Sequence, residues 1–240
     1  MIKPRICILL NDLDEFDFAG LVDRFLPADK FKVDVVASFP PEPTQFEMIV
    51  PWSYRRVIKP SELSGNVIVL HSSPLPEGRG FSPIYYAFSE EKREYVISAI
   101  RATIEVDAGD IIAQVRFRIE ASYTAPFVRK LDQELSMRLI VKLLEYWPDG
   151  KVDGIKQKGV GSYRNRRYPK DSELDVTKKL ETLVPCMRGV EPKHPAFFYY
   201  NKVKYFVQIW PENPPNKPAE IFVNYPALNK KEIWDIHDSP

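Results

Sequence analysis

The order of apolar segments near the start of the chain limits its fold most. Residues 5–10 and 31–37 are apolar runs of strand length, and a third short run spans 46–50. Between the first two, apolar side chains recur at helical spacing over 18–26, and Pro27 ends that pattern. A strand, helix, strand order places two parallel strands side by side. We therefore predict an α/β fold, with a Rossmann-like, mostly parallel sheet and helices on both faces.

The loop after the first predicted strand excludes one common use of such a fold. Dinucleotide-binding proteins place a Gly-rich turn at this point, so that backbone N–H groups can approach a phosphate. Residues 11–15 read Asn-Asp-Leu-Asp-Glu, which contains no Gly and whose carboxylates would repel an anion. We therefore expect neither NAD nor ATP to bind at this loop.

Apolar runs continue the pattern beyond the first fifty residues. Residues 67–70 form a short run typical of a buried strand, and 95–103 are apolar on both alternating sets, as a central strand would be. Residues 111–119 alternate strictly between apolar and polar side chains, which predicts a half-buried strand near the margin of the sheet. A helical stripe over 125–147 stops at Pro148.

The composition changes after this predicted helix. We predict that residues 1–150 form the α/β domain and that residues 151–240 form a smaller, mainly β C-terminal region. Within that region, residues 198–200 and 205–209 are expected to form a hairpin, because both are aromatic-rich and flank a short polar turn. A last short strand is expected at 220–223.

Charge and cysteine content exclude several classes of function. Lys and Arg number 34 against 33 for Asp and Glu, so no basic field favours nucleic acid or an anionic membrane. Cys7 and Cys186 are too few for a disulfide framework or a thiolate-rich zinc site. No apolar run approaches the roughly 20 residues of a membrane span, and no secretory leader is expected. We therefore expect a soluble, cytoplasmic protein without a metal ion.

Two titratable residues, His71 and Asp107, mark the ends of the most distinctive stretch. His71 follows the strand 67–70 and opens a loop rich in Pro and Gly, and Asp107 lies in the turn Val-Asp-Ala-Gly-Asp at 106–110. A His at the end of a buried strand, facing an Asp on such a turn, would form a proton-transfer pair. Taken singly, a strand-end His is more often structural, and an Asp in a turn is more often a cap.

The two motifs together resemble the formyltransferases that use 10-formyltetrahydrofolate. In that family a His followed by an S-L-L-P-type and R-G-x-x-P loop is paired with an Asp in a V-D-T-G turn. The loop here reads His-Ser-Ser-Pro-Leu-Pro and then Arg-Gly-Phe-Ser-Pro, and Asp107 follows His71 by 36 positions, as in the family. The resemblance covers roughly residues 1–150 and is strong between 67 and 111.

This resemblance implies a catalytic pair and a folate pocket. His71 would take a proton from the attacking amine, and Asp107 would orient the imidazole and favour its protonated form. The segment after the third predicted strand resembles the family's pterin pocket, although an ordinary strand-to-helix connection is about as probable for each side chain. The implied cofactor-binding residues are Tyr54, Arg55, Arg56, Val57, Ile58, Val106 and Gly109.

One position departs from the family pattern. The reaction forms a tetrahedral oxyanion, which needs a preplaced hydrogen-bond donor. In the family this donor is usually an Asn two residues before the His, and here that position holds Val69. Either a protonated His71, or a backbone N–H or hydroxyl of Ser72 or Ser73, takes over, or turnover is slow, or catalysis has been lost. We favour a replacement donor, because a chain without a working site would be hard to reconcile with both loops.

The residues after 150 resemble the sugar N-formyltransferase branch of the family. A segment Arg-Arg-Tyr-Pro-Lys-Asp-Ser-Glu-Leu-Asp at 166–175, followed by Pro-Ala-Phe-Phe-Tyr at 195–199, carries this resemblance. These enzymes formylate a nucleotide-linked deoxyamino sugar for surface polysaccharide such as lipopolysaccharide O-antigen. Arginines would pair with the diphosphate, although basic loops are more often simply solvated. The implied substrate-binding residues are Arg79, Tyr163, Arg164 and Arg167.

The prediction is therefore an enzyme that moves the formyl group of 10-formyltetrahydrofolate to the amino group of a nucleotide-linked deoxyamino sugar. The aromatic hairpin favours a homodimer. Transfer to initiator Met-tRNA is disfavoured, because those relatives append a longer RNA-binding domain and a basic surface. Two alternatives stay open: a formyltetrahydrofolate hydrolase, and a catalytically weakened folate-binding protein of the same fold.

Overall fold

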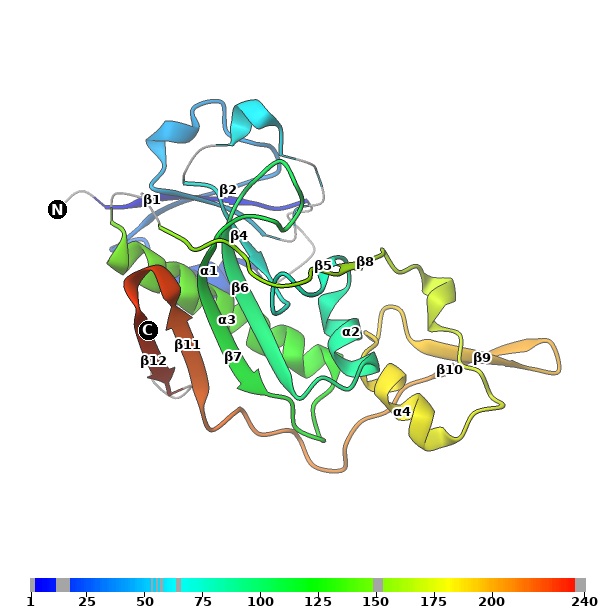
Figure 1. Ribbon diagram of the computed structural model, residues 1–240. Helices are drawn as coiled ribbons and strands as arrows, with labels where there is room; N and C mark the ends of the chain where they lie inside the picture. Colours follow the sequence, from blue (N-terminus) through cyan, green and yellow to red (C-terminus); the bar gives the residue numbers. More distant parts are fainter. Residues whose placement is uncertain are drawn as a thin grey trace.

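The computed structural model describes residues 3–11, 18–52, 54, 56, 58–63, 66–148 and 153–235. Its strands and longer helices (Figure 1) are β1 (Arg5–Leu9), α1 (Phe18–Phe25), β2 (Lys32–Val36), β3 (Met48–Pro51), β4 (Ile68–His71), β5 (Arg79–Gly80), α2 (Pro83–Ser89), β6 (Glu94–Arg101), β7 (Ile111–Arg118), α3 (Ala125–Tyr146), β8 (Tyr163–Arg164), α4 (Leu180–Arg188), β9 (Ala196–Tyr200), β10 (Val203–Val207), β11 (Ile221–Tyr225) and β12 (Lys230–Trp234). Single-turn 3-10 helices occupy Pro43–Gln45, Pro60–Glu62, Pro169–Ser172 and Pro226–Leu228. Within these described ranges, no helix is long and apolar enough to cross a membrane.

The first four strands form the parallel half of the sheet. β1 pairs in parallel with β2 on one side and with β3 on the other. A parallel bridge between Ile49 and Val67 joins β3 to the segment that continues into β4. The predicted α/β class, with a parallel sheet and a helix between its first two strands, is confirmed.

The sheet is mixed rather than mostly parallel. β4, β6, β7, β11 and β12 are neighbours in this order, and each pairs with the next in antiparallel fashion. β6 and β7 are joined by the short segment 102–110, which reverses the chain and leaves no room for the crossover that a parallel pair needs. The parallel arrangement predicted for the whole sheet therefore ends at β4.

Helices α1, α2 and α3 cover one face of the sheet, and no long helix covers the other within the described residues. Ile6 and Ile8 of β1 belong to the core cluster that also contains the buried side chains of α1, α2 and α3. Cys7 and Leu9 point to the opposite face, because side chains alternate along a strand, and they pack in a second cluster with Phe46. That face is covered by the segments between β2 and β4. The five prolines from position 40 to position 60 prevent longer helices from forming in these segments.

β7 lies inside the sheet and not near its margin as predicted. It pairs with β6 on one side and with β11 on the other, where Val115 lies opposite Val223. The local alternation could not reveal this, because β11 comes from the far end of the sequence. One sheet thus contains strands from both sides of residue 150, and the division into two domains stays a prediction.

The predicted hairpin is confirmed as β9 and β10, which pair in antiparallel fashion. Figure 1 shows this hairpin projecting away from the sheet, with α4 beside it. Leu174, Met187 and Ala196 form a small core of their own beneath these elements. The region after residue 150 therefore has its own packing in addition to the two strands that it adds to the sheet.

The last strand, β12, is connected to the end of α3 through the carboxylate of Glu232. The Tyr146 hydroxyl donates a hydrogen bond to Glu232, and Nε1 of Trp234 donates another to it at 2.8 Å. Lys230 forms an ion pair with the same carboxylate at 3.0 Å. Burial raises the pKa of Glu232, but these donors lower it more, to about 2. Trp234 and Lys230 belong to β12 itself, so the carboxylate connects this strand to α3 through the Tyr146 hydroxyl.

Candidate active site

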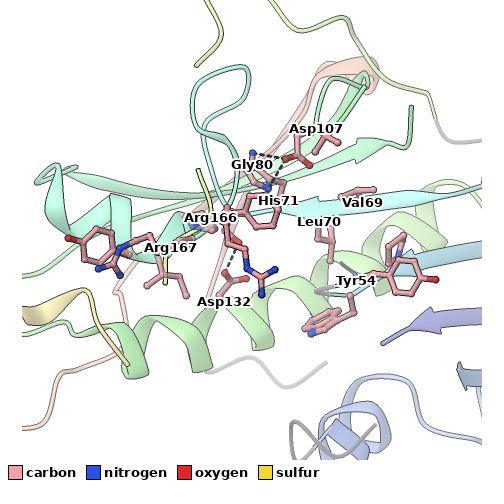
Figure 2. A pocket seen from close by; sticks show the side chains of 18 of the residues that line it. Tyr54, Val69, Leu70, His71, Gly80, Asp107, Asp132, Arg166 and Arg167 are labelled. Carbon is pink, nitrogen blue, oxygen red and sulfur yellow. Dashed lines mark hydrogen bonds and ion pairs between the residues drawn. The ribbon is translucent and has the colours of Figure 1, made fainter. Parts of the chain in front are cut away.

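His71 is the last residue of β4, and its side chain is 9% exposed. Ring atom Nε2 lies 2.9 Å from the carbonyl oxygen of Gly78. A carbonyl oxygen only accepts hydrogen bonds, so Nε2 carries a proton and Nδ1 is the accepting nitrogen of the neutral ring. Nδ1 lies 3.5 Å from Oδ2 of Asp107 (Figure 2). The predicted convergence of His71 and Asp107 is therefore present, with Nδ1 as the atom that can receive a proton.

Asp107 is held in a fixed conformation by its neighbours. Its φ of 54° is left-handed, which costs an L-residue about 1 kcal/mol and must be stabilised by surrounding contacts. The N–H of Gly80 donates to Oδ2 at 2.9 Å. Gln157 donates from Nε2 to the carbonyl oxygens of Asp107 and Gly109, each at 2.8 Å. These hydrogen bonds fix the turn, so the carboxylate of Asp107 already lies beside His71.

The loop that contacts both catalytic candidates is fixed by residues from beyond position 150. β5 pairs in parallel with β8, and the N–H of Gly78 donates to Oγ of Ser162 at 2.8 Å. Gly80 has a φ of +96°, and a Cβ at this position would lie 2.4 Å from the carbonyl oxygen of Arg164. Only glycine accommodates both this conformation and this close approach. The C-terminal region is thus part of the site's framework.

A cavity of about 740 Å³ opens over His71 and Asp107. Both parts of the chain line it, which brings most of the predicted site residues together. Those that line it are Tyr54, Arg56, Ile58, His71, Val106, Asp107, Tyr163 and Arg167. Arg55 and Val57 lie outside the described residues.

Three predicted site residues do not line this cavity. Arg79 forms an ion pair with Glu105 at 2.9 Å and donates to Gln157 at 2.8 Å. Arg164 forms an ion pair with Glu90 at 2.5 Å. Gly109 packs its Cα against the backbone of β6, where a Cβ would come within 1.7 Å of a carbonyl oxygen. In this arrangement these residues hold the loops around the cavity in place.

Sequence reasoning missed a carboxylate on α3, Asp132, which also lines the cavity. Three hydroxyl groups donate to it: Ser72 at 2.6 Å and Tyr95 at 2.5 Å to Oδ2, and Ser136 at 3.0 Å to Oδ1. The sequence indicated this role only weakly, because Asp132 directly follows Leu131 of the apolar stripe and such a position is typical of the edge of a solvated helix face. Arg166 and His194 line the cavity as well.

Val69, at the position of the family's oxyanion donor, also lines the cavity. It packs against an apolar cluster of Leu75, Ile100 and Ile111 and offers no hydrogen bond there. The Ser72 hydroxyl donates to the carboxylate of Asp132, and the Ser73 N–H donates to the carbonyl oxygen of His71 at 3.0 Å. Two of the replacement donors considered are therefore already engaged.

Comparison with known proteins identifies the family. Residues 25–144, half of the chain, match the family described as formyl transferase. The methionyl-tRNA formyltransferase of Bacillus cereus (strain G9842) is 32% identical over 158 residues, which cover 64% of this chain and 49% of that protein. The chain thus spans about half the length of the curated relatives it matches.

Solved structures share the fold at lower identity. HypX from Aquifex aeolicus, in complex with tetrahydrofolic acid, has a TM-score of 0.70 and 18% identity, and the match covers 91% of this chain and 42% of HypX. A sugar N-formyltransferase from Shewanella sp FDAARGOS_354 has a TM-score of 0.67 and 17% identity, with 88% and 99% covered. The family match contains His71 and Asp107, whose side chains meet at one cavity. This chain therefore belongs to the formyl transferase family.

Proposed function

We propose that this protein transfers the formyl group of 10-formyltetrahydrofolate to the amino group of a nucleotide-linked deoxyamino sugar. The observation that carries the proposal is the buried imidazole of His71, with Nδ1 directed at Asp107 on the wall of a large cavity. This pair combines an acceptor for one proton with a negative charge that stabilises the imidazolium once it forms.

The reaction needs one proton to move as bonds to the formyl carbon change. The acceptor amine attacks the formyl carbon, which forms a C–N bond and a tetrahedral oxyanion. Nδ1 of His71 accepts the proton that the amine loses, and the carboxylate of Asp107 stabilises the resulting positive charge. The C–N bond to N10 of the folate then breaks, and the same proton neutralises the departing nitrogen. Because the Nε2–H donates to the Gly78 carbonyl, the ring keeps its orientation throughout.

The oxyanion requires a donor in place of the missing Asn. The Ser72 hydroxyl and the Ser73 N–H are engaged, and the Ser73 side chain does not line the cavity. We therefore assign this role to the Nδ1–H that His71 gains on protonation, one of the donors expected from the sequence, because Nε2–H stays on Gly78 and the 3.5 Å from Nδ1 to Asp107 is long for a hydrogen bond. Such a donor exists only after the base has accepted a proton. The chemical step is then expected to be slower than in relatives with a permanent donor.

The cavity lining supports a folate at one part of the site. Trp52, Tyr54, Ile58 and Val106 contribute aromatic and apolar surface, which suits a flat pterin ring, and exposed backbone groups at such walls can bind its polar edge. The bound folate would supply the formyl carbon, and these residues would hold and orient its ring.

The C-terminal region supports an anionic, sugar-linked acceptor. Arg166 and Arg167 both line the cavity, and guanidinium groups bind phosphate oxygens in bidentate fashion. The guanidinium carbon of Arg167 lies 3.2 Å from the ring centre of Tyr85, which holds that side chain in place. We also propose a homodimer through the β9–β10 hairpin, where Tyr200 and Phe206 are each 64% exposed.

Mass spectrometry of candidate acceptors, incubated with enzyme and 10-formyltetrahydrofolate, tests this function. One added formyl group on a UDP- or dTDP-linked amino sugar is expected, and His71→Ala and Asp107→Ala should each abolish it. Asp29→Ala, at an exposed position outside the cavity lining, serves as the matched control and should leave the rate unchanged.

The same assay separates the alternatives. Initiator Met-tRNA belongs in the acceptor panel, because the curated relatives act on it by name. Formylation of that tRNA but of no amino sugar would refute the sugar assignment. Release of formate in the absence of any amine would identify a hydrolase. Folate binding without formylated product or released formate would identify a non-catalytic binder. This alternative is included because Val69 is apolar at the position of the family's oxyanion donor.

A further inference from the structure

We propose that Asp132 binds the protonated amino group of the acceptor before transfer, an inference that rests on the formyltransferase function proposed above. Asp132 projects from α3 into the same cavity as His71. In Figure 2 the carboxylates of Asp107 and Asp132 lie on opposite sides of the His71 imidazole. Two carboxylates therefore flank the His71 imidazole in this cavity, and the mechanism above uses only that of Asp107.

The hydrogen bonds of Asp132 leave room for a ligand. The hydroxyls of Ser72 and Tyr95 donate to Oδ2, and that of Ser136 donates to Oδ1. An ionised carboxylate offers about four acceptor positions, so one remains on Oδ1. Burial and the charge of Asp132 raise the pKa of Tyr95 well above its usual value, which keeps this hydroxyl a donor. The network orients the carboxylate without saturating it.

In the part of the chain that the structure describes, Asp132 has no ion-pair partner. Its three hydrogen-bond partners are neutral hydroxyls. Arg129, one turn earlier on α3, is paired with Glu191 at 2.6 Å. A carboxylate held away from bulk water gains stability from a cation with which it can pair. An incoming positive group would therefore be favoured at this position.

The acceptor of an N-formyl transfer supplies such a group. An aliphatic amine is mostly protonated near neutral pH, so the acceptor arrives as an ammonium ion. Asp132 and His71 line one cavity, so an acceptor bound at Asp132 can reach the base without leaving the site. The ammonium releases one proton to solvent to become nucleophilic, and the neutral amine leaves Asp132 and passes a second proton to Nδ1 of His71 as it attacks.

Calorimetry with two matched ligands tests the proposal. The probes are UDP- and dTDP-linked 4-amino-4,6-dideoxyglucose and the corresponding 6-deoxyglucose nucleotides, which carry a hydroxyl in place of the amine. With tetrahydrofolate present, wild-type protein is expected to prefer the amine. Asp132→Asn should weaken amine binding by roughly 10- to 100-fold, as expected for a charged hydrogen bond, and leave the hydroxyl ligand nearly unaffected. The affinity for tetrahydrofolate should not change.

Matched variants separate recognition from structure. Ser136→Ala removes one donor but keeps the charge, so it should lower the melting temperature and preserve the preference for the amine. Should Asp132→Asn not fold, Asp132→Ser removes the charge and keeps a hydroxyl for the network, and it replaces the first variant. An unchanged ratio of amine to hydroxyl affinity in the charge-removing variant would overturn the proposal, as would a wild-type protein without that preference.

The transfer assay distinguishes failure of this inference from failure of the proposed function. N-formyl product from the amine ligand, together with an unchanged affinity ratio in Asp132→Asn, would refute the role of Asp132 and leave the function standing. No product from any acceptor would refute the function, and the role of Asp132 with it.

Discussion

The substitution Glu232→Gln isolates the contribution of one charged carboxylate to the attachment of the last strand. Glu232 connects β12 to the end of α3, and its side chain is 19% exposed. Glutamine has nearly the same shape and keeps an oxygen that can accept a hydrogen bond, but it carries no charge. The variant therefore removes the ionic part of the interaction with Lys230 and weakens the bonds from Tyr146 and Trp234.

The magnitude follows from the pKa of this carboxyl group. The pKa falls from 4.5 to about 2 on folding, and each unit corresponds to about 1.4 kcal/mol. The charged form thus contributes at most about 3.5 kcal/mol. We expect about 2 to 3 kcal/mol, because the partner Lys230 is 45% exposed to screening solvent. Since the folded pKa is depressed, this stability is fully present above pH 4.5 and is lost as the pH falls towards 2.

Urea unfolding at pH 7 and pH 3.5, followed by tryptophan fluorescence, measures this effect. At pH 7 the variant should unfold with a free energy about 2 to 3 kcal/mol below that of the wild type. At pH 3.5 the gap should narrow to about 1 to 2 kcal/mol, because part of the wild-type contribution has been lost. Glu181→Gln, at a side chain that is 78% exposed, is the matched control. An equal gap at both pH values would refute the ionic account of this connection.

Three further predictions concern the site. Gly80→Ala should lower the free energy of unfolding by about 2 kcal/mol or more in urea titrations. Gly159 also has a positive φ, but no atom lies within 4 Å of a new Cβ there, so Gly159→Ala should lower the free energy of unfolding by less. Equal losses in the two variants would contradict the predicted clash at Gly80. Gln157→Ala removes two hydrogen bonds from the turn of Asp107, so steady-state kinetics should show kcat roughly 5- to 50-fold lower with unchanged folate affinity. Tyr95→Phe removes a donor to the α3 carboxylate and should destabilise the protein by about 1 to 2 kcal/mol in thermal unfolding; an unchanged melting temperature would count against that network.

The parts of the fold and site that could be predicted are those with a local or motif-level signal. The apolar runs of β1 and β2 and the helical spacing between them identified the parallel start of the sheet, because period and length depend on neighbouring residues alone. His71 and Asp107 were identified because each sits in a recognisable loop at a fixed separation. Their meeting in space depends on the loop after His71, which contacts His71 through the Gly78 carbonyl and Asp107 through the Gly80 N–H.

The parts that could not be predicted depend on contacts between distant segments. β11 joins β7 across more than a hundred residues, so the strict alternation of β7 was read as a margin strand. Asp132 belongs to the site only because hydroxyls from β6 and from the end of β4 converge on it. Arg79 was taken for a ligand-binding residue, and its partners Glu105 and Gln157 lie 26 and 78 positions away.

The short pairing of β5 with β8 also has consequences for how the protein is made and how it can diverge. During synthesis, the segment 157–164 emerges long after His71 and Asp107, so the geometry around those two residues is completed late. The same segment carries Tyr163 into the cavity. Mutations there that adapt the protein to a new acceptor will therefore also disturb the alignment of its proton-transfer machinery, and the two properties will evolve together.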